Sequence, residues 1–254
     1  MALLRAKKEI NKLKKKKKHA SPINIVKTLP NELLVEIVGK VASHSMADLC
    51  QMKLSCKDFL NASEEGYVYQ HASMENFALI PLPWFTNEKE TSFLRRCREN
   101  DNLEILYREG MVQYFSTSMV NLGFENLKKA ALEGHHEAKY VYSMLLMANC
   151  GEDEEGRKLG FDLFGELKNS TCNSTVARCR KRVKSFIKSM WVKNHVVVQN
   201  LSLVCCSDTC GGTEKLKKHS TWSDEEVDND GVGVSCKYCN GNHELGLFAN
   251  IFRI

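Results

Sequence analysis

Apolar residues recur at helical spacing soon after the amino end of the chain. They follow Leu29 and Pro30 at i, i+1, i+4, i+5 and i+8, namely Leu33, Leu34, Ile37, Val38 and Val41. Residues at this spacing lie on one side of an α-helix, so the pattern predicts an amphipathic helix here. Pro30 suits the first turn of that helix, where the N–H that proline lacks has no helical partner.

A second helix is predicted to begin at Ser45. Ser45 and Asp48 have the spacing of a capping box, in which the two side chains bind backbone N–H groups of the first turn. The apolar residues Leu49, Met52, Cys56 and Phe59 continue the helical period. Gly66 interrupts the pattern, and a third short element is expected to begin at Tyr67, Val68 and Tyr69.

The middle of the chain reads as successive helices. The segment Pro81-Leu82-Pro83 predicts a linker, because proline disfavours helix in the residue before it. Residues 87–192 then have apolar positions at helical spacing, interrupted at Gly151 to Gly156. The last of these predicted helices, from about Thr175 to Val192, is basic.

Charge is concentrated in the first 27 residues. They hold ten Lys or Arg and one Glu, a net charge of +9 against +5 for the whole chain, so the remainder is net −4. This tail is expected to be disordered because its like charges repel, and the five lysines Lys14, Lys15, Lys16, Lys17 and Lys18 are a candidate nuclear-import signal. A generally basic nucleic-acid-binding body is not supported.

No apolar run reaches the roughly 18 to 20 residues that span a bilayer, and no secretory signal is visible. We therefore expect a protein of the nucleus or cytoplasm, or of both, without a membrane partner. In that reducing environment the eleven cysteines are expected to be thiols or metal ligands.

The composition changes after His195. Residues Val196 to Val204 are rich in β-branched side chains and suggest a strand, and 211–233 read as a mobile polar loop. Candidate ligands for structural zinc flank that loop, namely Cys206, Cys210, Cys236, Cys239 and His243, with Cys205 and His219 as alternates. Reduced thiols near a β-hairpin are the alternative. A RING domain is rejected, because it needs about eight regularly paired ligands for two zinc ions.

The amino-terminal pattern resembles an F-box. Its resemblance rests on Leu29-Pro30-x-Glu32-Leu33-Leu34-x-x-Ile37, then Leu49 and Ser55-Cys56-Lys57-x-Phe59. The resemblance implies a three-helix unit at about 28–73 that docks onto a Skp-type adaptor, which in turn binds a cullin. By resemblance, the residues of the interface or its core are Leu29, Pro30, Leu33, Leu34, Ile37, Leu49, Cys56 and Phe59.

A 33-residue period links two parts of the middle. Glu104, Tyr107, Met111 and Val112 recur as Glu137, Tyr140, Met144 and Leu145. Helix–turn–helix repeats of the TPR or Sel1-like kind have a similar period, and an irregular helical domain is the alternative. F-box, helical middle and carboxy-terminal cysteines together resemble a group of plant F-box proteins, which implies substrate binding by 87–192.

The sequence thus predicts a mainly α protein. A three-helix F-box precedes a repeat-like or irregular helical domain, and residues 196–254 form a small cysteine-rich β or loop segment. The expected function is a non-catalytic substrate-recognition adaptor of a Skp–cullin–F-box ubiquitin ligase, with an unknown protein substrate. A non-degradative F-box scaffold and, with less support, a zinc-dependent nucleic-acid binder are the alternatives. No phosphate loop, nucleophile elbow or His-Glu-x-x-His site indicates an enzyme.

Overall fold

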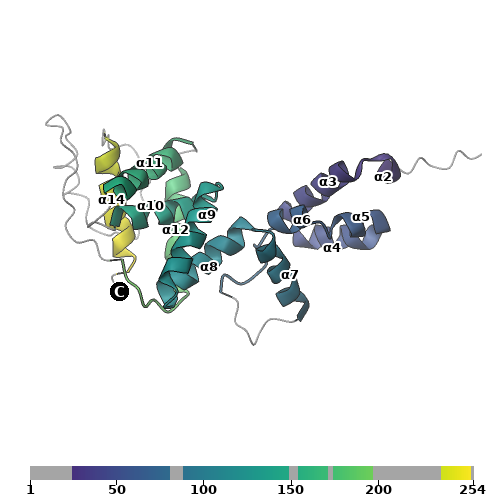
Figure 1. The fold of residues 1–254 in the computed structure, drawn as a ribbon, viewed down its shortest axis with the longest axis horizontal. Helices are drawn as coiled ribbons and strands as arrows, with labels where there is room; N and C mark the ends of the chain where they lie inside the picture. Colours follow the sequence, from purple (N-terminus) through teal and green to yellow (C-terminus); the bar gives the residue numbers. More distant parts are fainter. Residues whose placement is uncertain (1–24, 81–87, 149–153, 171–173, 197–235, 253–254) are drawn as a thin grey trace, which may run out of the picture. The chain divides into compact units, whose positions relative to one another are not determined.

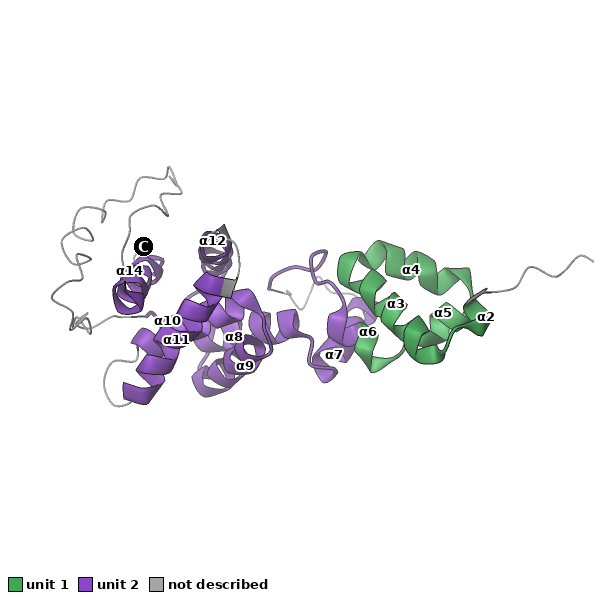
Figure 2. Ribbon diagram, turned by 90° about the horizontal axis from the view of Figure 1, so that it is seen from above, with its two compact units in different colours: residues 1–68 green, residues 69–254 purple. Residues whose placement is uncertain are grey.

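The computed structural model describes residues 25–80, 88–148, 154–170, 174–196 and 236–252. All the regular secondary structure in these ranges is helical. The chain divides into two compact units, residues 1–68 and 69–254, which are coloured separately in Figure 2. Residues 1–24 of the predicted basic tail, the Pro81-Leu82-Pro83 linker, most of the expected strand and the loop at 211–233 lie outside the described residues. Residues 25–27, which were expected to be disordered with the rest of the tail, are helical.

The first unit is built from short helices. They are α2 (Ile25–Thr28), α3 (Asn31–His44), α4 (Met46–Ser55) and α5 (Lys57–Ala62), and the next helix, α6 (Gly66–His71), contains the boundary between the units. Helices α3, α4 and α5 contact one another, and their described core is small and without aromatic rings. Its buried residues are Leu34, Val38, Ala42, Leu49, Ala62 and Val68.

Local capping explains where α4 begins. Ser45 is extended, with φ −153° and ψ 118°, and its side chain accepts a hydrogen bond from the backbone N–H of Asp48 at 3.1 Å. This satisfies one of the N–H groups that a helix start leaves without a partner. The predicted helix start at Ser45 is therefore confirmed.

The predicted continuation of this helix through Cys56 to Phe59 is wrong. Cys56 is extended, with φ −158° and ψ 164°, so α4 ends at Ser55 and α5 begins at Lys57. The Ser55 hydroxyl donates to the Met52 carbonyl at 2.7 Å, which satisfies an acceptor that the end of α4 would otherwise leave open. Two consecutive helices can bury residues at the same spacing as one, which is why the period alone did not reveal the break.

The described helices of the second unit have 12–17 residues. They are α7 (Glu88–Glu99), α8 (Leu103–Ser116), α9 (Val120–Leu132), α10 (His136–Ala148), α11 (Glu154–Ser170), α12 (Ser174–Lys188) and α14 (Lys237–Asn250), as Figure 1 shows. Helix α9 packs against α8 and α10, and α10 also packs against α11, α12 and α14. One core joins these helices, and its largest buried aromatic residues are Tyr107, Tyr140, Phe115, Phe161, Phe186 and Phe248.

Close contact between α8 and α9 depends on glycine. A Cβ atom added at Gly123 would lie 2.4 Å from the backbone N of Tyr114 and 2.9 Å from the carbonyl oxygen of Gly110. Both neighbours are backbone atoms, which cannot move aside as a side-chain end can. The small residue at 123 thus sets how closely the first helical hairpin of this unit packs.

Helix α14 corrects the expectation for the carboxy-terminal segment. Residues 237–250 were expected to be β or loop, but they form a helix whose residues Leu245 and Phe248 are fully buried. Leu245, Phe248 and Phe252 lie at helical spacing on the side that joins the core. The glycines at 241 and 246 lower helix propensity, so packing and not propensity determines this element.

Candidate protein-interaction face

Helix α3 divides its apolar residues between two faces. Leu34 and Val38 are buried in the first unit, whereas Leu33 and Ile37 remain 47% and 41% exposed. Each pair is separated by four residues, so each forms a short stripe along the helix. The sequence pattern had placed all four on one side, and the structure shows that only one stripe fills the core.

The other residues named from the F-box resemblance occupy three environments. Leu49 is buried beside the core stripe, Pro30 is exposed at the start of α3, and Leu29, Cys56 and Phe59 are partly buried. The set therefore mixes residues that stabilise the first unit with residues that remain accessible to a partner. Leu33 and Ile37, with Pro30 beside them, are the accessible apolar members, and we call these three the α3 face.

Sequence reasoning missed further exposed apolar residues in this unit. Leu54 is 88% exposed, and Leu60 and Tyr67 are 44% and 42% exposed. Leu54 follows the buried Leu49 by five residues, which is roughly 140° around the helix and therefore well off the core stripe. The sequence signal that could have predicted its exposure was an apolar residue at a position off the core stripe. Tyr67 lies over Gly39, where an added Cβ would approach its ring to 2.6 Å.

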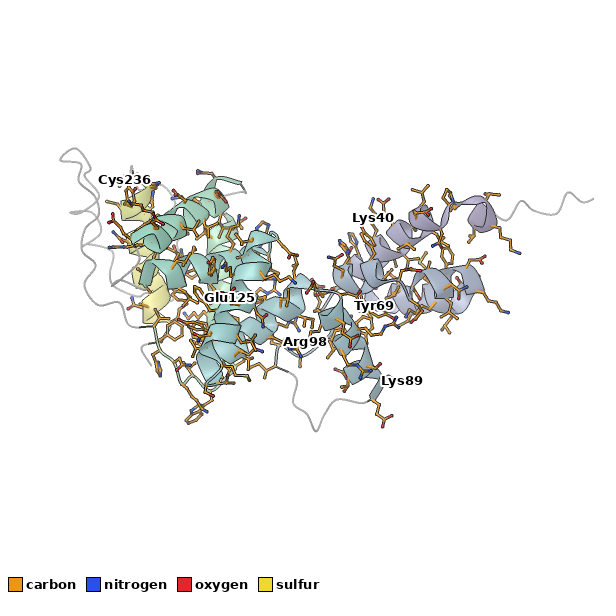
Figure 3. All side chains as sticks on the ribbon, viewed as in Figure 1. Lys40, Tyr69, Lys89, Arg98, Glu125 and Cys236 are labelled. Atoms are coloured by element: carbon orange, nitrogen blue, oxygen red, sulfur yellow. The ribbon has the colours of Figure 1, made fainter. Side chains whose placement is uncertain are left out.

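Polar residues border the exposed apolar stripe. Lys40 and Glu36 form an ion pair at 3.2 Å on α3, and both side chains are largely in solvent (Lys40 is labelled in Figure 3). Such a pair contributes little to stability, about 0.3–0.5 kcal/mol. Apolar side chains with a charged border are typical of a surface that binds another protein.

The second unit contains a partly buried cluster of charges instead. Glu104 accepts hydrogen bonds from Arg108 and Arg182, both at 2.7 Å, and its other oxygen lies 2.9 Å from His135 Nε2. Burial alone would raise the pKa of Glu104, but the His135 hydrogen bond and the two arginine charges outweigh it and lower this pKa from 4.5 to about 2. The cluster thus holds a carboxylate firmly in its charged form.

This cluster explains the 33-residue period. Arg182 of α12 also pairs with Glu137 at 3.1 Å, so the two glutamates that recur at this period bind one arginine. The recurring Tyr107 and Tyr140 are both fully buried, as are Met111 and Met144. Helices α8 and α10 therefore present equivalent side chains to the same neighbour, as repeated units do.

A second buried group ties α14 into the unit. Glu244 binds Arg180 through two hydrogen bonds of 2.8 and 2.7 Å and accepts a third from the Tyr140 hydroxyl at 2.7 Å. Paired oxygens and nitrogens of this kind form the stronger class of ion pair. Next to it, burial and the Glu137 charge raise the pKa of Cys179 to about 12, which disfavours a reactive thiolate.

The predicted zinc site is only partly described. Cys236 caps α14, its sulfur accepts from the Cys239 backbone N–H at 3.3 Å, and Cys239 is buried (Cys236 is labelled in Figure 3). Within the described ranges, no group of three or more His, Cys, Asp or Glu residues could hold a metal ion. Cys206 and Cys210, with the alternates Cys205 and His219, lie outside those ranges, so zinc binding stays a prediction.

Nuclear import and the absence of a membrane span were the two remaining expectations. The lysines at 14–18 lie outside the described residues, and nuclear import stays a prediction. No helix in the described part of the chain is long and apolar enough to cross a membrane.

Comparison with known proteins places both units in a family context. Residues 77–188 match the family model described as plant tetratrico peptide repeats. A protein of Arabidopsis thaliana named as a candidate F-box protein, At1g67623, is 30% identical over 184 residues, which are 72% of this chain and 60% of that protein. The chain thus spans less than two thirds of that relative.

Other relatives carry the same family name. The F-box protein At2g35280 of Arabidopsis thaliana is 30% identical over 135 residues, which are 53% of this chain and 80% of that protein. The F-box protein At1g67340 of the same plant is 25% identical over 138 residues, 54% of this chain and 36% of that protein. No solved structure was found to match.

Proposed function

The chain belongs to the F-box proteins of plants, and we propose that it is the substrate-recognition adaptor of a Skp–cullin–F-box ubiquitin ligase. In this proposal the first unit binds a Skp-type adaptor, and through it a cullin, while the second unit binds the protein to be ubiquitinated. The receptor performs no chemistry itself. It raises the local concentration of the target beside the ubiquitin-charged enzyme.

One observation supports the proposal above the others. The α3 face leaves two large aliphatic side chains, Leu33 and Ile37, 47% and 41% exposed beside a core that is small for a folded unit. Complete burial of such a side chain contributes about 1.5–3 kcal/mol, so a partner that covers both would gain affinity and would stabilise the unit. A groove on a helical adaptor is the matching surface for an amphipathic helix of this kind.

Co-purification with a plant Skp-type adaptor tests this assignment. The wild-type chain is expected to bind, and Leu33→Asp combined with Ile37→Asp is expected to weaken binding at least about 100-fold, because charged groups would be buried without partners. Matched controls are Leu132→Asp and Leu159→Asp, which change exposed leucines of the second unit and are expected to leave adaptor binding unchanged. Circular dichroism checks that the double variant and both controls retain their helix content.

Two results would contradict the proposal. The first is failure of the wild-type chain to bind any plant Skp-type adaptor. The second is equal loss of binding in the α3 variants and in the controls, which would remove the α3 face from the interface. Adaptor binding without any change in target lifetime on adaptor depletion would favour the non-degradative scaffold instead.

A further inference from the structure

Helix α12 is unusually rich in positive charge. It has six basic side chains and no acidic one, namely Arg178, Arg180, Lys181, Arg182, Lys184 and Lys188. Arg180 and Arg182 are neutralised by glutamates of the second unit, Glu244 for the first, and Glu104 and Glu137 for the second. The core network therefore accounts for two of the six charges.

Three other cations of α12 face solvent. Arg178, Lys181 and Lys188 are exposed, and none of them forms an ion pair with a residue that the structure describes. They lie at i, i+3 and i+10, which places them on one face of the helix. Neighbouring like charges destabilise a helix by roughly 0.2–0.5 kcal/mol per pair, so this arrangement is not explained by the stability of α12.

An exposed tryptophan follows the end of this helix. Trp191 is 82% exposed, although its backbone is held in place. Its carbonyl accepts a hydrogen bond from the Ser116 hydroxyl at 2.6 Å, and the backbone N–H groups of Lys193 and Asn194 donate to the Phe115 carbonyl at 2.8 and 3.0 Å. A fixed backbone presents the indole ring to solvent at little further cost in entropy on binding.

The residues around Trp191 alternate between core and solvent. Met190 and Val192 pack against the core of the second unit, whereas Trp191 and Lys193 are exposed. This alternation is that of an extended segment with one buried side. Since Trp191 is three positions after Lys188, their Cα atoms are at most about 11 Å apart, and a short peptide can contact both.

We propose that the exposed cations of α12 and Trp191 together bind an acidic peptide segment that carries an apolar residue. We call Arg178, Lys181, Lys188 and Trp191 the α12 cationic face. The cations would attract the acidic residues of the ligand, and the indole would cover its apolar side chain, as tryptophan often does at the centre of an interface. That this peptide belongs to a ubiquitination target rests on the proposed function, whereas the binding itself does not.

A protein ligand agrees better with the charges than nucleic acid does. Outside the first 27 residues the chain is net −4, and this face offers three cations that form no ion pair with a described residue. Proteins that bind nucleic acid through phosphates commonly make roughly six to ten such contacts over a broad basic surface. A small cationic face on an acidic body instead matches a short acidic segment. A short segment extends little beyond the face, so the acidic surface around it repels the segment less than it would repel a long polyanion.

Fluorescence anisotropy tests the proposal on the full chain, measured alone and with a Skp-type adaptor. The probe is a fluorescein-labelled peptide of five glutamates and two leucines, and the reference is the same peptide with glutamine for glutamate. The acidic peptide is expected to bind and the glutamine peptide is not. Neutralising the face by Arg178→Gln, Lys181→Gln and Lys188→Gln is expected to weaken binding about 10-fold or more, as is Trp191→Ala.

A matched triple variant separates a specific face from general charge. Lys89→Gln, Lys128→Gln and Lys158→Gln remove the same charge from other helices of the second unit and should change affinity less than about 2-fold. Equal loss in the two triple variants would overturn the proposal. So would an unchanged affinity in Trp191→Ala, or no binding of the acidic peptide to the wild-type chain.

Two competing occupants are distinguished in the same assay. Tighter binding of a single-stranded DNA oligonucleotide of equal charge would overturn the proposal in favour of nucleic acid. The five acidic residues between 224 and 230 can also be neutralised. If that raised the affinity for the acidic peptide about 10-fold, the occupant would be the chain's own acidic segment and not a target peptide. Adaptor binding is measured in every variant, so loss of peptide binding with adaptor binding retained leaves the proposed function standing.

Discussion

The two units of this chain bury apolar surface to very different extents. In the first unit the described core consists of aliphatic residues, and large apolar side chains such as Leu33 and Leu54 remain in solvent. In the second unit six large aromatic residues are fully buried, and the inward charges are paired across helices. Small domains bury a smaller fraction of their surface than large ones, which makes the first unit the more dependent on a partner.

Exposed apolar residues therefore have a different meaning in each unit. The second unit has a large core of its own, and its exposed tryptophan lies in one short segment at the edge of that core. In the first unit the exposed residues Leu33 and Ile37 form a stripe next to the core stripe. That stripe indicates a surface completed by another protein, whereas the charge network of the second unit indicates internal stability.

The largest effect is expected from the core of the second unit. Phe248→Ala should lower its free energy of unfolding by about 3–5 kcal/mol, because Phe248 is fully buried and its loss leaves a cavity. Hydrogen exchange followed by mass spectrometry should show faster exchange in α10 and α14 and unchanged exchange in α3. An unchanged unfolding energy would mean that α14 is not part of this core.

Acid should act on the second unit through Glu104. Its pKa falls from 4.5 to about 2 on folding, so this carboxylate stabilises the folded state above pH 4.5, and the contribution is lost as the pH falls from about 4.5 towards 2. A difference of about 2.5 pKa units corresponds to roughly 3 kcal/mol. Arg108, Arg182 and His135 contact it, Tyr107 lies close to it, and Glu137 shares Arg182 with it.

Chemical denaturation at several pH values measures that contribution. The stability gap between wild type and Glu104→Gln should be largest near pH 6 and should shrink by roughly 3 kcal/mol towards pH 2. Glu133→Gln, at an exposed position in the same unit, serves as the control and should change stability by less than about 0.5 kcal/mol throughout. A gap that does not depend on pH would show that Glu104 is not held charged by its neighbours.

Local patterns predicted much of this architecture. The α3 period, the Ser45 cap and the 33-residue repeat of Glu104 as Glu137 are visible in the sequence, because each depends on neighbours or on one repeated unit. The ion pair of Arg182 with Glu104 joins residues 78 positions apart, and a helical period contains no information about such partners. Helix α14 was missed for the same reason, since its packing partners lie far away in the chain.

The candidate site was predicted less completely. Resemblance located the α3 face, but it did not separate Leu33 from Leu34, which are neighbours in the sequence with opposite environments. Only the packing of α4 and α5 on α3 determines which stripe is covered. Leu54 and Trp191 were missed because a single exposed apolar residue is common on protein surfaces and carries little signal by itself.

The smallest effect on stability is expected from Leu33→Ala, and comparing it with Leu34→Ala tests whether the two stripes of α3 differ in burial. Leu34→Ala should destabilise the first unit by about 2–4 kcal/mol, because this side chain is 4% exposed, whereas Leu33→Ala should change stability by less than about 0.5 kcal/mol. Hydrogen exchange in α3 and α4 of the free chain measures both. For adaptor affinity the order should reverse: Leu33→Ala should have the larger direct effect, since Leu33 would lie in the interface. If Leu33→Ala destabilised the free chain as much as Leu34→Ala, the α3 face would belong to the interior of the unit and would not be open to a partner.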